Sequence, residues 1–190
     1  MTADDLAGTL DFLQRAEALK STLRNGTTAS GRQESTAEHT WRLCLMVMVL
    51  ADGVEGIDAL RLLKMCLVHD LGEAIGGDIP ATDPRAATKT AQERRDLLAL
   101  TATLPPGRRD EILGLWEEYE AGTSPEAVLA KGFDKLETIL QHNQGRNPPG
   151  FDYAFNLAYG ARHTARHTLT AAIRAVLDED TRARMARPAE

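Results

Sequence analysis

Residues 62–68, LLKMCLV, are apolar at every position except Lys64, and the run ends in the ionisable pair His69-Asp70. A helix that is apolar on nearly all sides lies in the centre of a domain, because every face must contact other apolar groups. The His-Asp pair is therefore expected to be buried too. An unpaired buried carboxylate is costly unless it is protonated, so a positive charge is needed nearby. A divalent metal ion suits an adjacent imidazole and carboxylate.

The rest of the sequence predicts helices almost throughout, because apolar residues recur with a period near 3.6 and no long stretch alternates with a period of two. Ser35 and Glu38 form a capping box, and Ser124 followed by Pro125 is a second helix start. The expected helices cover about residues 4–24, 36–51, 57–69, 86–104, 107–120, 124–142 and 152–184, with loops at 25–33 and 76–84. These patterns predict one all-α domain over residues 1–190, with no linker that divides it.

Composition restricts the classes of partner. The chain has 190 residues and a net charge of −6, which gives no electrostatic basis for binding duplex nucleic acid or an anionic membrane surface. The longest apolar run, 43–51, is too short to span a bilayer, and aspartates interrupt the first 14 residues where a signal peptide would lie. Cys44 and Cys66 both fall in apolar helical sequence, so they are interpreted as reduced residues of a cytoplasmic protein.

Two further ionisable residues fall on predicted apolar helix faces. His39 lies in the first turn of helix 36–51 and shares a face with Leu43 and Met46. Asp134 lies within helix 124–142 on a stripe with Ala130, a small residue that lets another helix approach closely. The resulting set offers two nitrogen and two oxygen ligands from three helices. The candidate metal ligands are His39, His69, Asp70 and Asp134.

Each of these residues also has an ordinary structural interpretation. A single histidine on a core face is most often a hydrogen-bonded core residue, and a single aspartate is more often exposed or a cap than a ligand. A His-Asp dipeptide also occurs by chance in many proteins. The combination of spacing, helix placement and the following Glu73 and Asp78 favours a metal site.

The order and spacing of three blocks carry a family resemblance. The blocks are ESTAEHTWRL at 34–43, KMCLVHDLGEAIGGDIP at 64–80, and LWEEYEAGTSPEA followed by FDKLE within 115–137. The sequence resembles the HD-domain phosphohydrolase superfamily, and within it the 5′-deoxynucleotidase-like branch. The resemblance covers about residues 20–142 and precedes the C-terminal helices at 152–184. It implies an HD-type helical bundle around a metal site, and its ligand pattern falls on the same four residues.

The resemblance also implies catalytic roles for two carboxylates. Glu73 lies one helical turn beyond His69, which suits a general base and acid for the attacking water, whereas by itself it would be interpreted as an exposed helix-end residue. Asp78 lies in a Gly-Gly loop, where turn formation or helix capping is the ordinary interpretation. In the family, the matching glutamate and aspartate handle the attacking water and the leaving group. Trp41 is expected to pack in the core.

The predicted substrate contacts come from residues near the ligand blocks. Arg24 and Arg32 flank the loop before His39, and the guanidinium group suits a phosphate dianion. Arginines stand at matching distances in relatives, although any single arginine is usually a solvated surface residue. Lys135 is a further phosphate contact, and Glu118 resembles a family carboxylate near the sugar. Some relatives carry a tryptophan after the first arginine that discriminates against a ribose 2′-hydroxyl, whereas this chain has Asn25 there.

These observations predict a metal-dependent 5′-nucleotidase that releases phosphate from nucleoside monophosphates, with deoxynucleotides favoured. The metal would be Mn²⁺, Co²⁺, Fe²⁺ or Zn²⁺. Hydrolysis of another small phosphate ester or of a nucleotide anhydride is an alternative, as is a non-catalytic nucleotide- or metal-binding regulatory module. A homodimer is also expected, through an apolar stripe on the last helix: Leu169, Ile173, Val176 and Leu177.

Overall fold

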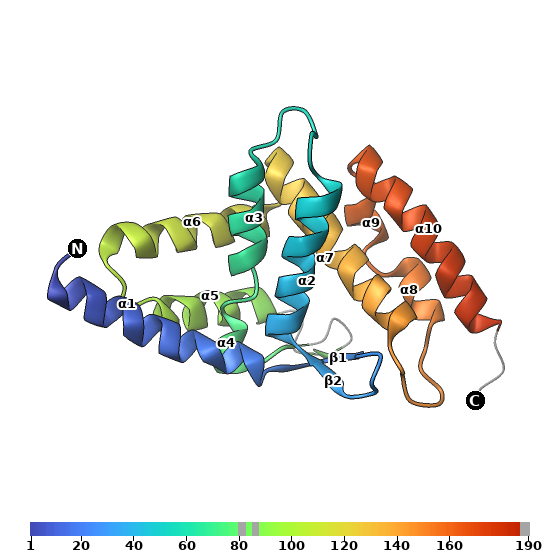
Figure 1. Ribbon diagram of the computed structural model, residues 1–190, viewed down its shortest axis with the longest axis horizontal. Coiled ribbons are helices and arrows are strands. Elements are labelled where there is room, and N and C mark those ends of the chain that lie inside the picture. Colours follow the sequence, from blue (N-terminus) through green and yellow to red (C-terminus); the bar gives the residue numbers. More distant parts are fainter. Residues whose placement is uncertain (80–82, 85–87, 187–190) are drawn as a thin grey trace.

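The computed structural model describes residues 1–79, 83–84 and 88–186 of the chain. Its helices are α1 (Ala3–Ala16), α2 (Thr36–Leu50), α3 (Ala59–Val68), α4 (Glu73–Gly76), α5 (Lys89–Leu100), α6 (Pro106–Ala121), α7 (Pro125–Gln144), α8 (Ala154–Ala158), α9 (Ala161–Thr164) and α10 (Thr168–Met185). α7 is central and contacts α2, α3, α6, α9 and α10. Figure 1 shows α1, α5 and α6 on one side of this centre and α8–α10 on the other. The predicted all-α architecture is confirmed.

Local signals place the starts of two helices that carry predicted ligands. The Ser35 hydroxyl accepts a hydrogen bond from the Glu38 backbone N–H, and the Glu38 carboxylate accepts one from the Ser35 N–H at 2.9 Å. This capping box starts α2 and leaves His39 in its first turn. At the start of α7, the Ser124 hydroxyl accepts a hydrogen bond from the Ala127 N–H at 3.2 Å. Because caps involve neighbouring residues only, both starts agree with the sequence prediction.

The main core forms where α2, α3 and α7 meet, with contributions from α6 and α10. Burying these apolar faces stabilises the fold by roughly 25 cal/mol for each Å² removed from water. The small residues on α7 allow its neighbours to approach closely. Residues of this core with essentially no exposed surface are Leu43, Leu62, Met65, Cys66, Ala127, Leu129, Ala130, Phe133, Leu136 and Ile139.

The prediction that Trp41 packs in the core is wrong. Its side chain is 66% exposed, because it lies two residues after His39 and a helix turns about 100° per residue. The same outer face of α2 exposes Leu45, Met48 and Val49. The inner face contains His39, Leu43 and Met46 as expected.

A small antiparallel hairpin replaces the predicted end of the first helix and part of the loop at 25–33. β1 (Leu23–Thr27) pairs with β2 (Gln33–Ser35), with Leu23 opposite Ser35 and Thr27 opposite Gln33. The chain leaves α1 at Ala16 and passes through a 3₁₀ turn, η1 (Glu17–Lys20), before β1. The Thr22 hydroxyl donates to the Ala18 carbonyl, a local hydrogen bond that competes with helix continuation. Strands this short carry too little alternation to be found from sequence.

The C-terminal region predicted as helical over 152–184 is divided into α8, α9 and α10. Gly160 separates α8 from α9 and has φ +66°, a conformation that favours glycine. A Cβ atom there would lie 2.5 Å from the Cβ of Lys135 on α7, so glycine also permits this close approach. His163 and His167, four residues apart, therefore do not share a helix: the first lies in α9 and the second caps α10.

The loop predicted at 76–84 lies only partly within the described residues. α4 ends at Gly76, and 77–79 have no regular structure, in agreement with the loop predicted at 76–84, but residues 80–82 of that loop lie outside the described residues. Within the described part of the chain, no helix combines the length and apolar character needed to cross a bilayer.

Candidate metal centre and substrate cavity

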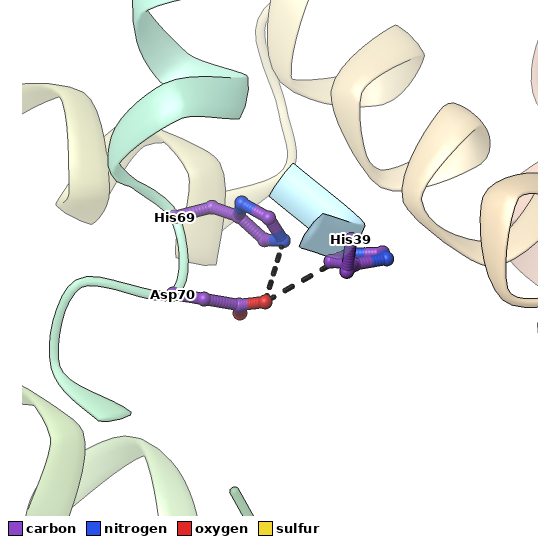
Figure 2. Close-up of side chains that lie close together, drawn as sticks. All are labelled: His39, His69 and Asp70. Carbon is purple, nitrogen blue, oxygen red and sulfur yellow. Dashed lines mark ion pairs between the residues drawn. The ribbon is translucent and has the colours of Figure 1, made fainter. Parts of the chain in front are cut away.

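Three predicted ligands converge from two helix ends. His39 is fully buried in the first turn of α2, and His69 directly follows α3 with Asp70 next to it. Figure 2 shows their side chains pointing toward one another. His69 Nε2 lies 3.0 Å from Asp70 Oδ2, and His39 Nε2 lies 3.8 Å from the same oxygen. One ligand atom from each residue lies within 4.8 Å of the other two, close enough to share one metal ion.

Asp134 joins this group from the middle of α7. Its Oδ1 lies 3.4 Å from His39 Nε2, while its Oδ2 accepts a hydrogen bond from the Tyr119 hydroxyl at 2.7 Å and contacts Lys135 Nζ at 2.8 Å. Burial by itself would raise the pKa of Asp134, but Lys135 and the two histidines hold it well below its usual range. Asp134 is therefore an ionised carboxylate with one oxygen toward the cluster.

The donor atoms fit a divalent metal ion. His39 Nε2, His69 Nε2 and Asp70 Oδ2 are buried, and none has a hydrogen-bond partner among the described residues. Such orphaned atoms are costly in an apolar interior unless a ligand satisfies them. The imidazole and carboxylate donors match first-row divalent ions. Burial and Arg24 would lower the pKa of His39, but Glu137 and Asp134 raise it to about 9, so a metal ion must displace a proton to bind Nε2.

Glu73 lies beside this cluster on the short helix α4, and only 1% of it is exposed. Its Oε2 accepts a hydrogen bond from the Thr36 hydroxyl at 3.0 Å, and its Oε1 accepts one from Lys89 Nζ at 3.0 Å. Burial, together with the negative charge of Asp70, raises the pKa of Glu73 to about 8, although Lys89 opposes the shift. A carboxylate with this pKa exchanges protons near neutral pH, which suits acid–base catalysis.

Asp78 follows α4, where its Oδ1 lies 3.5 Å from Lys89 Nζ. The same ammonium group donates to the Ile79 carbonyl at 3.2 Å and lies 3.3 Å from Glu93 Oε1. Lys89 therefore joins both predicted catalytic carboxylates, Glu73 and Asp78, from another helix.

Sequence reasoning missed Lys89 and Glu93, because no role was assigned to any residue of the predicted helix 86–104. A signal was present. Glu93, Leu97 and Leu100 lie on one face of α5 at offsets of four and three residues, and all three are buried. A charged residue on the same helix face as core leucines is expected to be buried and to need a partner of opposite charge.

Of the four predicted substrate contacts, Arg24 and Lys135 reach the cavity. Arg24 projects from β1; its Nη1 lies 3.5 Å from Asp70 Oδ2, and its Nη2 donates to the Thr138 hydroxyl at 3.2 Å. Burial would lower the pKa of Arg24, but Asp70 and other carboxylates raise it, so the guanidinium stays charged.

Arg32 and Glu118 lie elsewhere. Arg32 is an exposed hairpin residue whose guanidinium binds Glu38, with an Nη1–Oε2 distance of 2.9 Å. Tyr119 lines the cavity, but Glu118, one residue earlier on α6, points in another direction and does not line it. Its carboxylate instead accepts hydrogen bonds from Arg61 and from the Ser124 hydroxyl. Their positions do not support the predicted substrate contacts.

The cluster opens into a cavity of about 1110 Å³, large enough for a nucleotide. The candidate ligands His69, Asp70 and Asp134 and the candidate catalytic residues Glu73 and Asp78 line it together with Asn25 of β1. Phe155 and Tyr159 are stacked, with ring centroids 5.0 Å apart, and also line it. Further lining residues with basic side chains are Lys131, His142, Arg162, His163 and Arg166.

Comparison with known proteins agrees with this geometry. The family model of the HD domain matches residues 16–174. The chain belongs to the HD-domain family. The 5′-deoxynucleotidase HDDC2 of Danio rerio is 38% identical over 138 residues, which are 71% of this chain and 68% of the relative. The 5′-deoxynucleotidase HDDC2 of Homo sapiens is 36% identical over 138 residues, covering 71% of this chain and 67% of the relative.

Solved HD-domain structures have the same fold. A predicted metal-dependent phosphohydrolase from Magnetospirillum magnetotacticum MS-1 is 29% identical and superposes with a TM-score of 0.81 over 97% of this chain and 100% of that chain. The cyanophage S-2L HD phosphohydrolase DatZ, solved with dA and one catalytic Zn²⁺ ion, is 23% identical, with a TM-score of 0.57 over 90% of this chain and 95% of that chain. At that identity, the second likeness concerns the fold alone.

Proposed function

We propose that this HD-domain protein is a divalent-metal-dependent phosphohydrolase that converts nucleoside 5′-monophosphates, deoxynucleotides in particular, to nucleoside and phosphate. One observation carries the proposal: buried atoms of His39, His69 and Asp70 that lack a hydrogen-bond partner among the described residues lie together, and His69, Asp70 and Glu73 line one nucleotide-sized cavity. The names of the HD-domain relatives, which are 5′-deoxynucleotidases, support the choice of substrate.

In this proposal His39, His69, Asp70 and Asp134 hold the ion, which is Mn²⁺, Co²⁺, Fe²⁺ or Zn²⁺. When bound, such an ion offsets the charge of the phosphoryl group and makes water more acidic. The zinc ion in the DatZ structure agrees with a divalent ion in this fold.

Glu73 is the proposed general base. Its carboxylate accepts the proton of the attacking water, and the hydrogen bonds from Thr36 and Lys89 hold it in one orientation. The leaving 5′-oxygen of the nucleoside needs a proton in the same reaction. Asp78, which contacts the same lysine, is the proposed group at the leaving oxygen.

Arg24 and Lys135 are the proposed phosphate contacts. Both cations already lie beside carboxylates of the cluster, Arg24 at Asp70 and Lys135 at Asp134, so a phosphate bound there would meet them at short range. We propose that the stacked pair Phe155 and Tyr159 contacts the base. Asn25 is proposed to face the sugar. Because its side chain is small, discrimination between deoxyribose and ribose would depend on other contacts.

A phosphate-release screen tests this function. The metal-free protein is incubated with deoxy- and ribonucleoside mono-, di- and triphosphates, and Mn²⁺, Co²⁺, Zn²⁺ and Mg²⁺ are added in turn. We expect turnover of monophosphates that depends on the metal and is faster for deoxynucleotides. Metal binding without turnover of any phosphate ester would contradict the proposal and favour a regulatory binding module.

A specific observation favours one second candidate, hydrolysis of a nucleotide anhydride. Arg162 and Arg166 line the same cavity, as does Lys131, which pairs with Glu120 at 3.1 Å, and they would provide positive charge for a further phosphate. The same screen separates the candidates, because an anhydride hydrolase releases phosphate or diphosphate from di- or triphosphates and leaves monophosphates intact.

The expected homodimer needs a different surface from the one predicted. Leu177 of α10 is buried, and Leu169 and Ile173 pack against the core, so most of this stripe closes the domain, whereas Val176 is 61% exposed. We propose that a homodimer instead uses the exposed outer face of α2, which includes Trp41 and Met48. A monomer mass by light scattering at micromolar concentration would contradict it.

Two further proposals come from the sequence. The whole chain is proposed to be one domain, and the protein is proposed to reside in the cytoplasm, which agrees with free thiols at Cys44 and Cys66. Limited proteolysis tests the first, since a single domain should resist cleavage between the helices, and cell fractionation tests the second.

A further inference from the structure

The two histidines of the cluster are oriented by different partners. His69 Nδ1 lies 2.8 Å from the Cys66 carbonyl, a backbone acceptor one helical turn earlier. His39 Nδ1 instead forms a hydrogen bond with the Glu137 carboxylate. Both rings therefore direct Nε2 at the cluster, but only His39 depends on a side chain for this orientation. Glu137 lies 98 positions away in sequence, and its role was not found there.

Glu137 is itself held in place. It has no exposed surface, and Arg42 binds its Oε1 through Nε at 2.7 Å and through Nη2 at 2.6 Å. Arg42 Nη1 donates further to Gln144 Oε1 at 3.1 Å. Arg42 lies one turn after His39 on α2, and Glu137 lies one turn after Asp134 on α7. Two of the three helices that supply candidate ligands thus also supply the support.

The chemistry of these contacts sets the state of the imidazole. A carboxylate bound by a guanidinium group accepts hydrogen bonds and donates none, so His39 Nδ1 must carry the hydrogen. In a neutral imidazole, Nε2 then keeps its lone pair, and this is the atom that faces Asp70 and Asp134. Carboxylate–histidine pairs of this kind raise ligand basicity and fix the ring in metal sites.

A competing explanation is a second ion on the other side of His39. Glu34, His39 and Glu137 each offer an atom within 4.8 Å of the others. However, cations already bind both carboxylates: Glu137 contacts Arg42, and Glu34 Oε2 lies 3.6 Å from Arg24 Nε. His39 Nδ1 is also engaged by Glu137. The arrangement therefore resembles the support of one metal site more than a second site.

We propose that Glu137, anchored by Arg42, is a positioning residue that fixes the tautomer and ring orientation of His39 for metal binding. The inference rests on the proposed metal site, although it does not depend on the identity of the substrate. It assigns the glutamate of the FDKLE segment a function separate from that of the ligand Asp134.

The test measures metal affinity directly, by competition of metal-free protein with a chromophoric chelator for Zn²⁺ and Mn²⁺. Glu137→Gln should weaken binding about 10- to 100-fold, the usual cost of losing such a partner. Glu34→Gln is the matched control, because it neutralises a similarly buried carboxylate that makes no hydrogen bond to His39. The comparison is made at pH 8, since burial and Glu137 raise the pKa of Glu34 to about 7 and it must be ionised to serve as a control.

A second measurement reports orientation. In the zinc-loaded protein labelled with ¹⁵N-histidine, long-range ¹H–¹⁵N spectra should show His39 protonated at Nδ1 in the wild type, and this signal should change in Glu137→Gln and remain in Glu34→Gln. Equal loss of affinity in both variants, or an unchanged affinity in Glu137→Gln, would overturn the proposal. If Glu137→Gln does not fold, Arg42→Gln is the deciding variant. It keeps the Glu137 carboxylate as the acceptor for His39 but removes its anchor, so metal affinity should fall, by less than the roughly 10- to 100-fold expected for Glu137→Gln.

These readouts separate the inference from the proposed function. A protein that binds metal through a Glu137-dependent site but hydrolyses no nucleotide would contradict the proposed function and leave the positioning role intact. If the protein hydrolyses nucleotides but wild type and Glu137→Gln bind metal with equal affinity, the positioning role is contradicted and the proposed function stands.

Discussion

The two sides of the cavity are built differently. The candidate ligands stand on or directly after the long helices α2, α3 and α7, which meet in the main core. The candidate catalytic groups, Glu73 and Asp78, stand on the four-residue helix α4 and the chain after it, and a single ammonium group from α5 joins them. Core packing therefore sets the metal side, whereas a few charge interactions set the catalytic side. Substitutions on the first side should affect binding of the ion, and substitutions on the second should affect turnover alone.

The largest effect is expected for Asp70→Ala, on the metal side. Asp70 Oδ2 is the atom that both histidines approach, so its loss removes the centre of the cluster. We expect loss of bound metal and of all phosphate release. Metal analysis and the release assay on the same sample measure both. Full metal content in this variant would show that the ligand set is misassigned.

Glu73→Gln, on the catalytic side, should separate chemistry from binding. The amide keeps the size of the side chain but cannot accept the proton of water, so kcat should fall about 10²- to 10⁴-fold. Metal content should stay at the wild-type level, because the ligand set of His39, His69, Asp70 and Asp134 does not include Glu73. Near wild-type turnover with metal bound would mean that another group, or the ion without a protein base, activates the water.

Arg24→Met and Arg32→Met form a matched pair on the β1–β2 hairpin. Arg24 lies in the cavity, and a charged hydrogen bond is worth about 1.5–3 kcal/mol, so KM should rise roughly 10- to 100-fold while metal content stays full. Arg32 binds Glu38 on the surface, and its loss should leave KM nearly unchanged. A large KM effect at Arg32 would restore the role expected from sequence and would require movement of the hairpin.

The smallest effect is a change in pH dependence on the catalytic side. Burial and Asp70 raise the pKa of Glu73, Lys89 lowers it, and the net result is about 8. Removing the positive charge in Lys89→Met should therefore raise this pKa further. Because the base acts in its ionised form, the acidic limb of the kcat–pH profile should move to higher pH. Lys64→Met is the control, since Lys64 pairs with Glu111 away from the cavity, at 2.6 Å. Identical profiles for both variants would show that Lys89 does not tune the base.

Some site residues could be identified from sequence and others could not. The candidate ligands could be singled out because a histidine or aspartate on an apolar helix face is a local anomaly, visible within one or two turns. Lys89 gave only the weaker signal of charged residues in line with the buried leucines of α5, and Glu137 was not singled out. The partner of each lies on another helix: Lys89 contacts Glu73, and Glu137 contacts His39. Arg32 shows the opposite case, since proximity in sequence to His39 suggested a substrate contact, whereas its side chain binds Glu38 and does not line the cavity.

By itself, the sequence determined the helical character, the start of α2 at Ser35 and of α7 at Ser124, and the inward direction of His39 and Asp134. These features follow from interactions within about four residues, where periodicity and caps act. Only the tertiary structure decided which charges meet: that Glu137 supports His39 and that Lys89 reaches Glu73. Such pairings depend on how distant helices pack, and burial then makes each pairing strong, because buried charges without partners are too costly to persist.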